Sequence, residues 1–532
     1  MNAIGEKSGL LAILAGRGSE RSRLSVAVGA GLLLALALPP VRGFFWLAPV
    51  ALALLFSQMV HSDRPGRLAW LFGLVHQTAL LHWLFFLVPA KTIPFAALAQ
   101  IQAALTIFYV SAFYAIIGWL WGRLRRLTGP GWALAALPVF WVALEVWRGW
   151  GEMGFPWCLS GAAVIDTPLM PLLQASGEIG VSALWAFLAL ALVAVWGADL
   201  EPRLKVLSGA MTATLVVGLV IGSQLTPAVP GARTPTPTPT LKVAAIQADV
   251  ALGDKWVDGK IDSTRVPYSA LTRAAADSGA QFVVWAETAL PAYVLLTDIP
   301  LLNWTRRLVQ RSGIYLYTGF PDARRMPDGR TERYNSSGLF DPAGTVVDKY
   351  AKYHLLPIGE SMPFTSLIPA LAKVDVGQAE WTPGQPPQAM KIPTPEGDFA
   401  FSGLICFESA FSGLARQSIL RGSRCLVVLT NDGWFGETAG PRQHTDLARL
   451  RAAECGVPLI RCANNGISLI TDDHGRIQDQ LGLGRRGIVQ ADVTAGTGRT
   501  LYVRFGAWPL FWLLVTWLGT LAVFRWRRGL AA

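Results

Sequence analysis

The sequence is poor in charged residues, and this scarcity sets the first bound on what the protein is. Asp, Glu, Lys and Arg make up 15% of the 532 residues, whereas a typical soluble domain carries about 25%. The deficit is concentrated in eight long runs without any of these four residues, namely 24–41, 43–60, 68–90, 92–122, 127–144, 179–198, 206–232 and 505–524. The composition therefore excludes an ordinary soluble protein.

These uncharged runs predict membrane-spanning helices. A helix needs roughly 20 apolar residues to cross the hydrocarbon core, so the runs supply seven candidate spans in residues 1–226 and an eighth in residues 505–532. Positive charge precedes the first run, as it does in a signal peptide. Because six further runs follow closely, we interpret the first run as a retained helix.

The positions of Lys and Arg predict the orientation of the spans. Cytoplasmic loops accumulate positive charge. With the N-terminus inside, the inner segments hold the Lys and Arg residues of 64–67, 123–126, 203–205 and 525–528, and the short outer loops hold only Arg42, Lys91 and Arg148. The segment between the seventh and eighth spans then lies in the periplasm of a Gram-negative cell. The net charge of +11 reflects this topology, and the absence of a basic patch with aromatics argues against nucleic acid.

Between these spans, the chain divides into a spacer and one domain. Residues 227–240, PAVPGARTPTPTPT, alternate Pro and Thr and predict an extended spacer. Residues 241–500 alternate strand-like and helix-like stretches, which predicts an α/β layered domain with a mixed sheet. The expected strands are 241–250, 281–288, 314–320, a hairpin at 334–350, 399–406, 425–431 and 457–466, and the expected helices lie near 266–279, 300–312, 409–421 and 441–455.

The domain lacks the motifs of nucleotide and metal enzymes. It has no Walker loop, no dinucleotide-binding fingerprint and no His/Cys metal spacing, so we expect neither a cofactor nor a metal. Cysteine is scarce, and the odd total of five leaves at least one thiol unpaired. Cys425, Cys455 and Cys462 lie in apolar surroundings typical of a core. Cys406 instead ends a strand ahead of an expected helix, where a thiol gains thiolate character.

Two further stretches carry the groups that a cysteine nucleophile requires. WAETALP places Glu287 at the end of an apolar strand, where burial raises the pKa of a carboxyl towards that of a useful base. YAKYHLLPIGE places Lys352 in an apolar, aromatic neighbourhood, with Glu360 eight residues later. Taken singly, a helix-capping or salt-bridged glutamate and a solvated lysine are the better interpretations. A catalytic pair in which His354 is the base for Cys406 is our second-ranked interpretation.

In this order, WAETALP, YAKYHLLPIGE and LICFES resemble the Glu-Lys-Cys signature of the carbon–nitrogen hydrolase (nitrilase) superfamily. Seven helices before the domain and one after it resemble the apolipoprotein N-acyltransferase family within it, over the whole chain. The resemblance implies an α-helical membrane domain of about eight transmembrane helices, formed by residues 1–226 and 505–532. It also implies a nitrilase-like αββα sandwich in residues 241–500, joined to the first part by the spacer 227–240.

The resemblance also implies roles for individual residues. Cys406 resembles the nucleophile, Glu287 the general base, and Lys352, helped by the backbone N–H of Phe407, the group that stabilises the oxyanion. The supporting residues would be Glu360, Glu408, Phe407 and Asn335, and the substrate-binding residues Trp256, Trp434, Phe155 and Trp157. Phe407 stands where the family commonly has tyrosine, and PIGESMPF replaces the more usual PFGEYVP.

The implied reaction moves an acyl chain from the sn-1 position of a phospholipid, through a cysteine thioester, to the α-amino group of the N-terminal diacylglyceryl-cysteine of an apolipoprotein. The implied partners are these two substrates and the bacterial inner membrane, and we expect a monomer without nucleic acid. Two alternatives stay open. One is a membrane-tethered nitrilase-type amidase in which water attacks the thioester, and the other is a transporter or receptor with an inactive enzyme-like domain.

Overall fold

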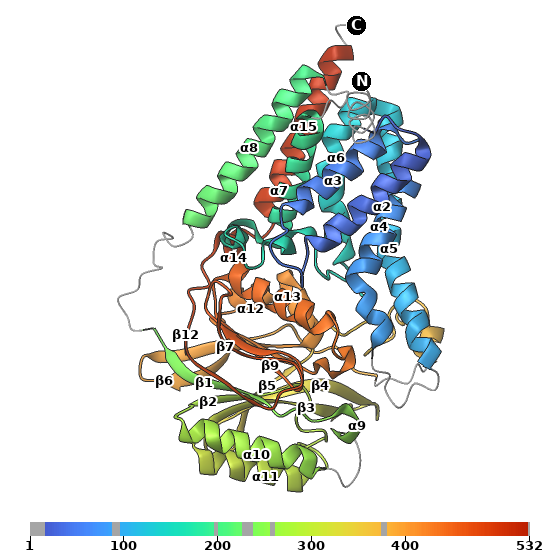
Figure 1. Cartoon of the computed structure of the whole chain (residues 1–532). Helices are drawn as coiled ribbons and strands as arrows, with labels where there is room; N and C mark the ends of the chain where they lie inside the picture. Colours follow the sequence, from blue (N-terminus) through green and yellow to red (C-terminus); the bar gives the residue numbers. More distant parts are fainter. Residues whose placement is uncertain are drawn as a thin grey trace, which may run out of the picture. The chain divides into compact units, whose positions relative to one another are not determined.

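The computed structural model describes residues 16–87, 96–195, 201–225, 238–255, 261–373 and 380–529. Most of the expected spacer 227–240 lies outside these residues. The chain forms two compact units (Figure 1). A helical unit comprises Met1–Phe85, Gln100–Thr226 and Phe505–Ala532, and a second unit comprises Phe86–Ala99 and Pro227–Arg504.

The helical unit is built from long apolar helices. These are α2 (Glu20–Leu36), α3 (Leu47–His61), α4 (Pro65–Leu81), α5 (Ala96–Thr128), α6 (Pro130–Arg148), α7 (Leu173–Val195), α8 (Pro202–Leu225) and α15 (Trp508–Gly529). Within the described residues, six helical stretches are long and apolar enough to cross a membrane, which supports a membrane protein. Helices α2 and α3 have only 17 and 15 residues, so the count of eight spans stays a prediction.

The second unit contains two sheets of six strands each. The first sheet, in spatial order, consists of β12 (Gly487–Thr494), β1 (Thr240–Gln247), β2 (Phe282–Trp285), β3 (Tyr315–Arg325), β4 (Thr331–Phe340) and β5 (Val346–Ala351). The second consists of β11 (Ile477–Leu481), β10 (Ser468–Thr471), β9 (Leu459–Ala463), β8 (Leu426–Thr430), β7 (Gly397–Ile405) and β6 (Met390–Thr394). In each sheet the three central strands run parallel, β1 to β3 and β7 to β9, and antiparallel strands flank them.

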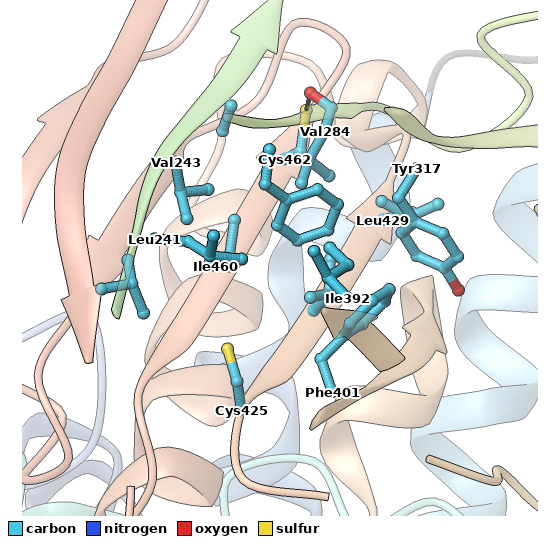
Figure 2. Packing of buried hydrophobic residues seen from close by; sticks show 14 of the residues in the cluster. Leu241, Val243, Val284, Tyr317, Ile392, Phe401, Cys425, Leu429, Ile460 and Cys462 are labelled. Carbon is cyan, nitrogen blue, oxygen red and sulfur yellow. Dashed lines mark hydrogen bonds between the residues drawn. The ribbon is translucent and has the colours of Figure 1, made fainter. Parts of the chain in front are cut away.

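Four helices cover the outer faces of the sheets. The apolar faces of α10 (Asp262–Asp277) and α11 (Ile299–Ser312) pack on the first sheet, and α12 (Ser412–Leu420) and α13 (Gly440–Cys455) pack on the second. Side chains of the two inner faces form the central core, which includes Cys425 and Cys462 (Figure 2). This arrangement confirms the αββα sandwich.

The central strands form because both of their faces are buried. Successive side chains of a strand point to opposite faces. In β1, Val243 and Ala245 therefore enter the core between the sheets, whereas Ala244 and Ile246 pack against the helices. A strand buried on both sides has an almost continuous apolar sequence. This explains why the apolar runs predicted these strands correctly.

Two of the sequence-based expectations need correction. The strand pattern predicted one mixed sheet, and the structure contains two, because β6, β10, β11 and β12 were not predicted. The sequence of β11, IQDQL, is largely polar and exposed, so it has no apolar run to mark it. The helix expected over 409–421 is interrupted, because Phe411 is extended between the short 3₁₀ turn η6 (Cys406–Ala410) and α12.

The close approach of the sheets at Gly403 can be tested by substitution. A Cβ atom at this position in β7 would overlap the hydroxyl of Tyr317 in β3, which is hydrogen-bonded to Ser337 Oγ at 2.6 Å. We expect Gly403→Ala to lower the free energy of unfolding by about 1–3 kcal/mol, measured as a lower thermal midpoint of the purified protein in detergent. The control is Gly413→Ala in α12, which meets no atom within 4 Å and should be neutral or slightly stabilising. An unchanged midpoint for Gly403→Ala would contradict the close packing.

Candidate active site

Cys406 lies at a sharp turn that directly follows a buried strand. It is the first residue after β7 and opens the turn η6, and its φ of 53° lies in the left-handed region. Non-glycine residues rarely adopt this conformation, and such strain concentrates at functional sites. The turn projects Cys406 out of the sheet, and the residue is partly exposed, unlike the four other cysteines, which are all buried.

Lys352 directly follows β5 and is 1% exposed. Its ammonium nitrogen lies 2.7 Å from Oε2 of Glu360. Burial alone would lower the pKa of Lys352, but the charges of Glu360, Cys406 and Glu287 outweigh it and raise the pKa above its ordinary value. The side chain is therefore a fixed cation, in contrast to the solvated lysine that the local sequence also allowed.

Glu287 lies just beyond the end of β2 and is also buried. Its two carboxylate oxygens have separate partners. The side-chain amide of Asn335 donates to Oε1 at 2.8 Å, and the backbone N–H of Asn431 donates to Oε2 at 3.0 Å. Asn335 also donates to Oε1 of Glu360 at 3.1 Å. A continuous chain of contacts thus joins Glu287 to Lys352 through Asn335 and Glu360.

Glu408 fixes the position of the lysine segment relative to the cysteine. Its carboxylate accepts hydrogen bonds from the hydroxyl of Tyr350 at 2.7 Å and from the backbone N–H groups of Tyr353 at 2.8 Å, His354 at 2.9 Å and Ile405 at 2.7 Å. Three of these donors lie within two positions of Lys352, and the fourth directly precedes Cys406. Burial raises the pKa of this carboxyl, and the hydrogen bonds partly offset that effect. Glu408 therefore orders the backbone of the site beside both the lysine and the cysteine.

The thiol of Cys406 lies within electrostatic reach of the other two groups. Burial, followed by the charge of Glu287, raises the pKa of Cys406, and Lys352 acts in the opposite direction. The expectation that Cys406 lies at the N-terminus of a helix is wrong, because it opens the short turn η6 and α12 begins only at Ser412. A thiol that is protonated at rest needs a base when it attacks, and the carboxylate of Glu287, which has the largest charge effect on this thiol, is the candidate.

His354 does not fit the alternative Cys–His pair. Burial, reinforced by Lys352, lowers the pKa of its imidazole to about 4. Its ring packs against Phe411 with centroids 3.9 Å apart. Its Nε2 atom is buried without a hydrogen-bond partner in the part of the chain that the structure describes. The contacts of this ring are thus aromatic, and we discard it as the base for Cys406.

The other expected site residues lie in different surroundings. Trp256 falls outside the described residues. Trp434 lies in the 3₁₀ turn η7 (Asp432–Phe435) and is 38% exposed. Phe155 and Trp157 belong to the helical unit, where their rings stack with centroids 5.8 Å apart. The side chain of Phe407 packs edge-to-face on Phe411 at 5.1 Å. Their roles in substrate binding stay predictions.

The structure adds two residues to the site that the sequence did not suggest. Asn431 directly follows β8, in the sequence LTNDG, and a polar strand end of this kind could have marked it. Lys255, adjacent to Trp256, donates from Nζ to the backbone carbonyl of Glu287 at 2.9 Å. Burial lowers the pKa of Lys255 to about 8, against the charge of Glu287. Among the described residues, no group of three or more His, Cys, Asp or Glu side chains is arranged to hold a metal ion.

Comparisons with known proteins match both units. Residues 30–191 match the family model of the apolipoprotein N-acyltransferase N-terminal domain, and residues 242–502 match that of carbon–nitrogen hydrolase. The chain is 31% identical over 517 residues to the apolipoprotein N-acyltransferase of Vibrio cholerae, covering 94% of this chain and 96% of the relative. It is 32% identical over 515 residues to that of Azotobacter vinelandii, covering 93% of each.

Among solved structures, a mutant of the Nesterenkonia AN1 amidase, from the nitrilase superfamily, is 20% identical. It has a TM-score of 0.38 and covers 52% of this chain and 100% of the amidase.

Proposed function

Because this chain belongs to the apolipoprotein N-acyltransferase family, and so is an acyltransferase, we propose that Cys406 carries the acyl chain as a thioester. The donor is the sn-1 ester of a phospholipid, and the acceptor is the α-amino group of the N-terminal diacylglyceryl-cysteine of an apolipoprotein. The observation that carries the proposal is the chain of contacts that joins Glu287 to Lys352 through Asn335 and Glu360, together with the charge effects of Glu287 and Lys352 on the Cys406 thiol.

In the first half-reaction, Glu287 removes the thiol proton as the sulfur attacks the ester carbonyl. A C–S bond forms, and the carbonyl oxygen becomes an oxyanion. Lys352 is a buried cation whose charge acts on the Cys406 thiol, and fixed charge of this kind stabilises a developing oxyanion most effectively where water is excluded. The ester C–O bond then breaks, and the leaving lysophospholipid oxygen takes the proton from Glu287.

In the second half-reaction, the free amine of the acceptor attacks the thioester carbonyl. Glu287 accepts the amine proton, the C–N bond forms, and the C–S bond breaks. Proton return to the sulfur restores the starting enzyme. Splitting one difficult transfer into two steps through a covalent intermediate is the general advantage of nucleophilic catalysis.

The proposal explains why a catalytic domain of this kind is joined to membrane-spanning helices. Both substrates are lipid-anchored, and extraction of their chains into water costs about 0.8 kcal/mol for each CH₂ group. We place residues 1–226 and 505–532 in the inner membrane, with residues 227–240 as a linker and the catalytic domain 241–500 in the periplasm. The segment after Glu360 exposes Phe364, Leu367 and Ile368, which supports a pocket entrance in contact with lipid.

Mass spectrometry of the full-length protein tests the proposal. We expect incubation in vesicles of a phospholipid with an isotope-labelled sn-1 chain to add that acyl mass to Cys406 and to none of the four buried cysteines. Addition of a diacylated lipopeptide should then remove the label from the protein and leave it on the peptide amine. Release of free fatty acid instead of labelled peptide would identify a hydrolase, and the absence of any adduct would indicate an inactive domain.

A further inference from the structure

A cluster of buried polar side chains lies behind the turn that carries Cys406. It consists of Ser409 in η6, Asp432 in η7, His444 in α13 and Arg461 in β9, and each of these residues is at most 2% exposed. Ser409 Oγ lies 3.0 Å from His444 Nε2, and His444 Nδ1 lies 3.1 Å from Asp432 Oδ1. The order of these contacts is that of a Ser–His–Asp triad.

The hydrogen bonding excludes a second nucleophile at this cluster. His444 Nε2 also lies 3.0 Å from the backbone carbonyl oxygen of Cys406. A carbonyl oxygen can only accept, so Nε2 must carry a proton and donate it. An imidazole in that state cannot take the proton of Ser409. The Ser409 hydroxyl itself donates to the same carbonyl at 2.9 Å.

Two donors on one carbonyl fix the orientation of a peptide plane. The peptide between Cys406 and Phe407 is planar and trans, so its N–H points away from its C=O. When Ser409 and His444 hold the carbonyl oxygen on the inner side, the N–H of Phe407 is turned to the opposite side. This N–H is the backbone donor that the resemblance to the family assigns to the oxyanion, beside Lys352.

We infer that His444 is a positioning residue for the oxyanion hole, acting through the Cys406–Phe407 peptide, with Ser409 as the second donor. The inference rests on the proposed role of Cys406 as nucleophile. It explains how a left-handed, strained turn keeps one conformation through two half-reactions. Glu408 binds the N–H of Ile405 on one side of the cysteine, and His444 binds the carbonyl on the other.

The remaining contacts hold His444 itself in place. Arg461 pairs with Asp432 Oδ2 at 2.8 Å, and the hydroxyl of Thr430 donates to Asp432 Oδ1 at 2.9 Å. Burial alone would raise the pKa of Asp432, but the charge of Arg461 and the hydrogen bond with His444 lower it below its ordinary value. Asp432 is thus a permanent anion, and it fixes the imidazole with Nε2 directed at the turn.

Two substitutions of His444 by amide residues distinguish the role of Nε2 from the role of Nδ1. The side-chain nitrogen of Gln in His444→Gln can reach the place of Nε2, so this variant should keep the donor to Cys406. The shorter amide of His444→Asn reaches only the place of Nδ1, so it should keep the Asp432 contact and lose the donor. Ser409→Ala removes the other donor with a small change in volume.

Two rates measured on the full chain in detergent and phospholipid test the inference. Thioester formation on Cys406 passes through an oxyanion, whereas alkylation of Cys406 by iodoacetamide does not. We expect His444→Asn to slow thioester formation by about 10²-fold, with the KM for phospholipid within about twofold and alkylation within about threefold of wild type. Ser409→Ala should slow thioester formation by about tenfold, and His444→Gln should stay within about tenfold of wild type.

The outcomes are distinguishable. Equal losses in thioester formation and alkylation would show that the turn has collapsed, and unchanged thioester formation in His444→Asn would show that the carbonyl needs no such donor. Either result overturns the inference. If His444→Asn fails to fold, the rates of thioester formation and of alkylation in Ser409→Ala test the inference in its place. A wild-type protein that is alkylated at Cys406 but forms no acyl adduct would instead overturn the proposed function, and the inference with it.

Discussion

Cys406→Ala and Cys406→Ser are expected to abolish acyl transfer while the protein stays folded and inserted in the membrane. The alanine variant has no group that can form the thioester. In the serine variant the hydroxyl is a much weaker acid than the thiol, so Glu287 is too weak a base to generate the alkoxide. We expect a loss of roughly 10⁴-fold or more in the rate of lipopeptide acylation. The uncatalysed rate of acylation limits the loss that can be measured.

The turn itself should tolerate these changes. Cys406 is partly exposed, and its left-handed backbone is held by neighbours that the substitutions do not touch. The change in unfolding free energy should be within about 1 kcal/mol, measured by thermal unfolding in the same detergent. Cys425→Ala is the matched control, because this cysteine lies in the core between the sheets. It should lose about 1–2 kcal/mol of stability and retain activity. Near-normal acyl transfer by the Cys406→Ala protein would contradict the assignment of Cys406 as the nucleophile.

The parts of the fold that the sequence predicted are those in which the chain is buried on both sides. Strands β2 and β8, and residues 243–246 of β1, consist almost entirely of apolar residues, because neither face meets water. The polar ends of such strands also predicted where the site would lie. Glu287 and Cys406 each follow a strand of this type, and their residue types already pointed to a nucleophile and a base.

The contacts that position these groups could not be predicted in the same way. Glu408 binds backbone groups more than 50 residues away in the sequence, and His444 reaches a carbonyl 38 residues before it. Such hydrogen bonds depend on which sheet edges and helices meet in three dimensions. No periodicity along the chain encodes that meeting. Asn431 shows the same limit, because it acts on Glu287 through a backbone N–H that any residue except proline would supply.

Lys352→Met should reduce acyl transfer by about 10³-fold, because it removes the cation beside the developing oxyanion. The substitution has a second effect that must be separated from the first. Lys352 and Glu360 form a largely buried ion pair, and removal of one partner leaves the other charge uncompensated. We expect a loss of about 2–3 kcal/mol of stability, seen as a lower thermal midpoint of the purified protein.

The double variant Lys352→Met/Glu360→Gln distinguishes the two effects. Glu360→Gln removes the uncompensated charge and keeps one acceptor oxygen for the amide of Asn335, so part of the lost stability should return. Activity should not return with it, because neutralising Glu360 supplies no cation at the reacting carbonyl. A double variant that regains both stability and acyl transfer would show that Lys352 serves only as the partner of Glu360. The oxyanion would then depend on backbone donors alone, and the peptide held by His444 would carry that role by itself.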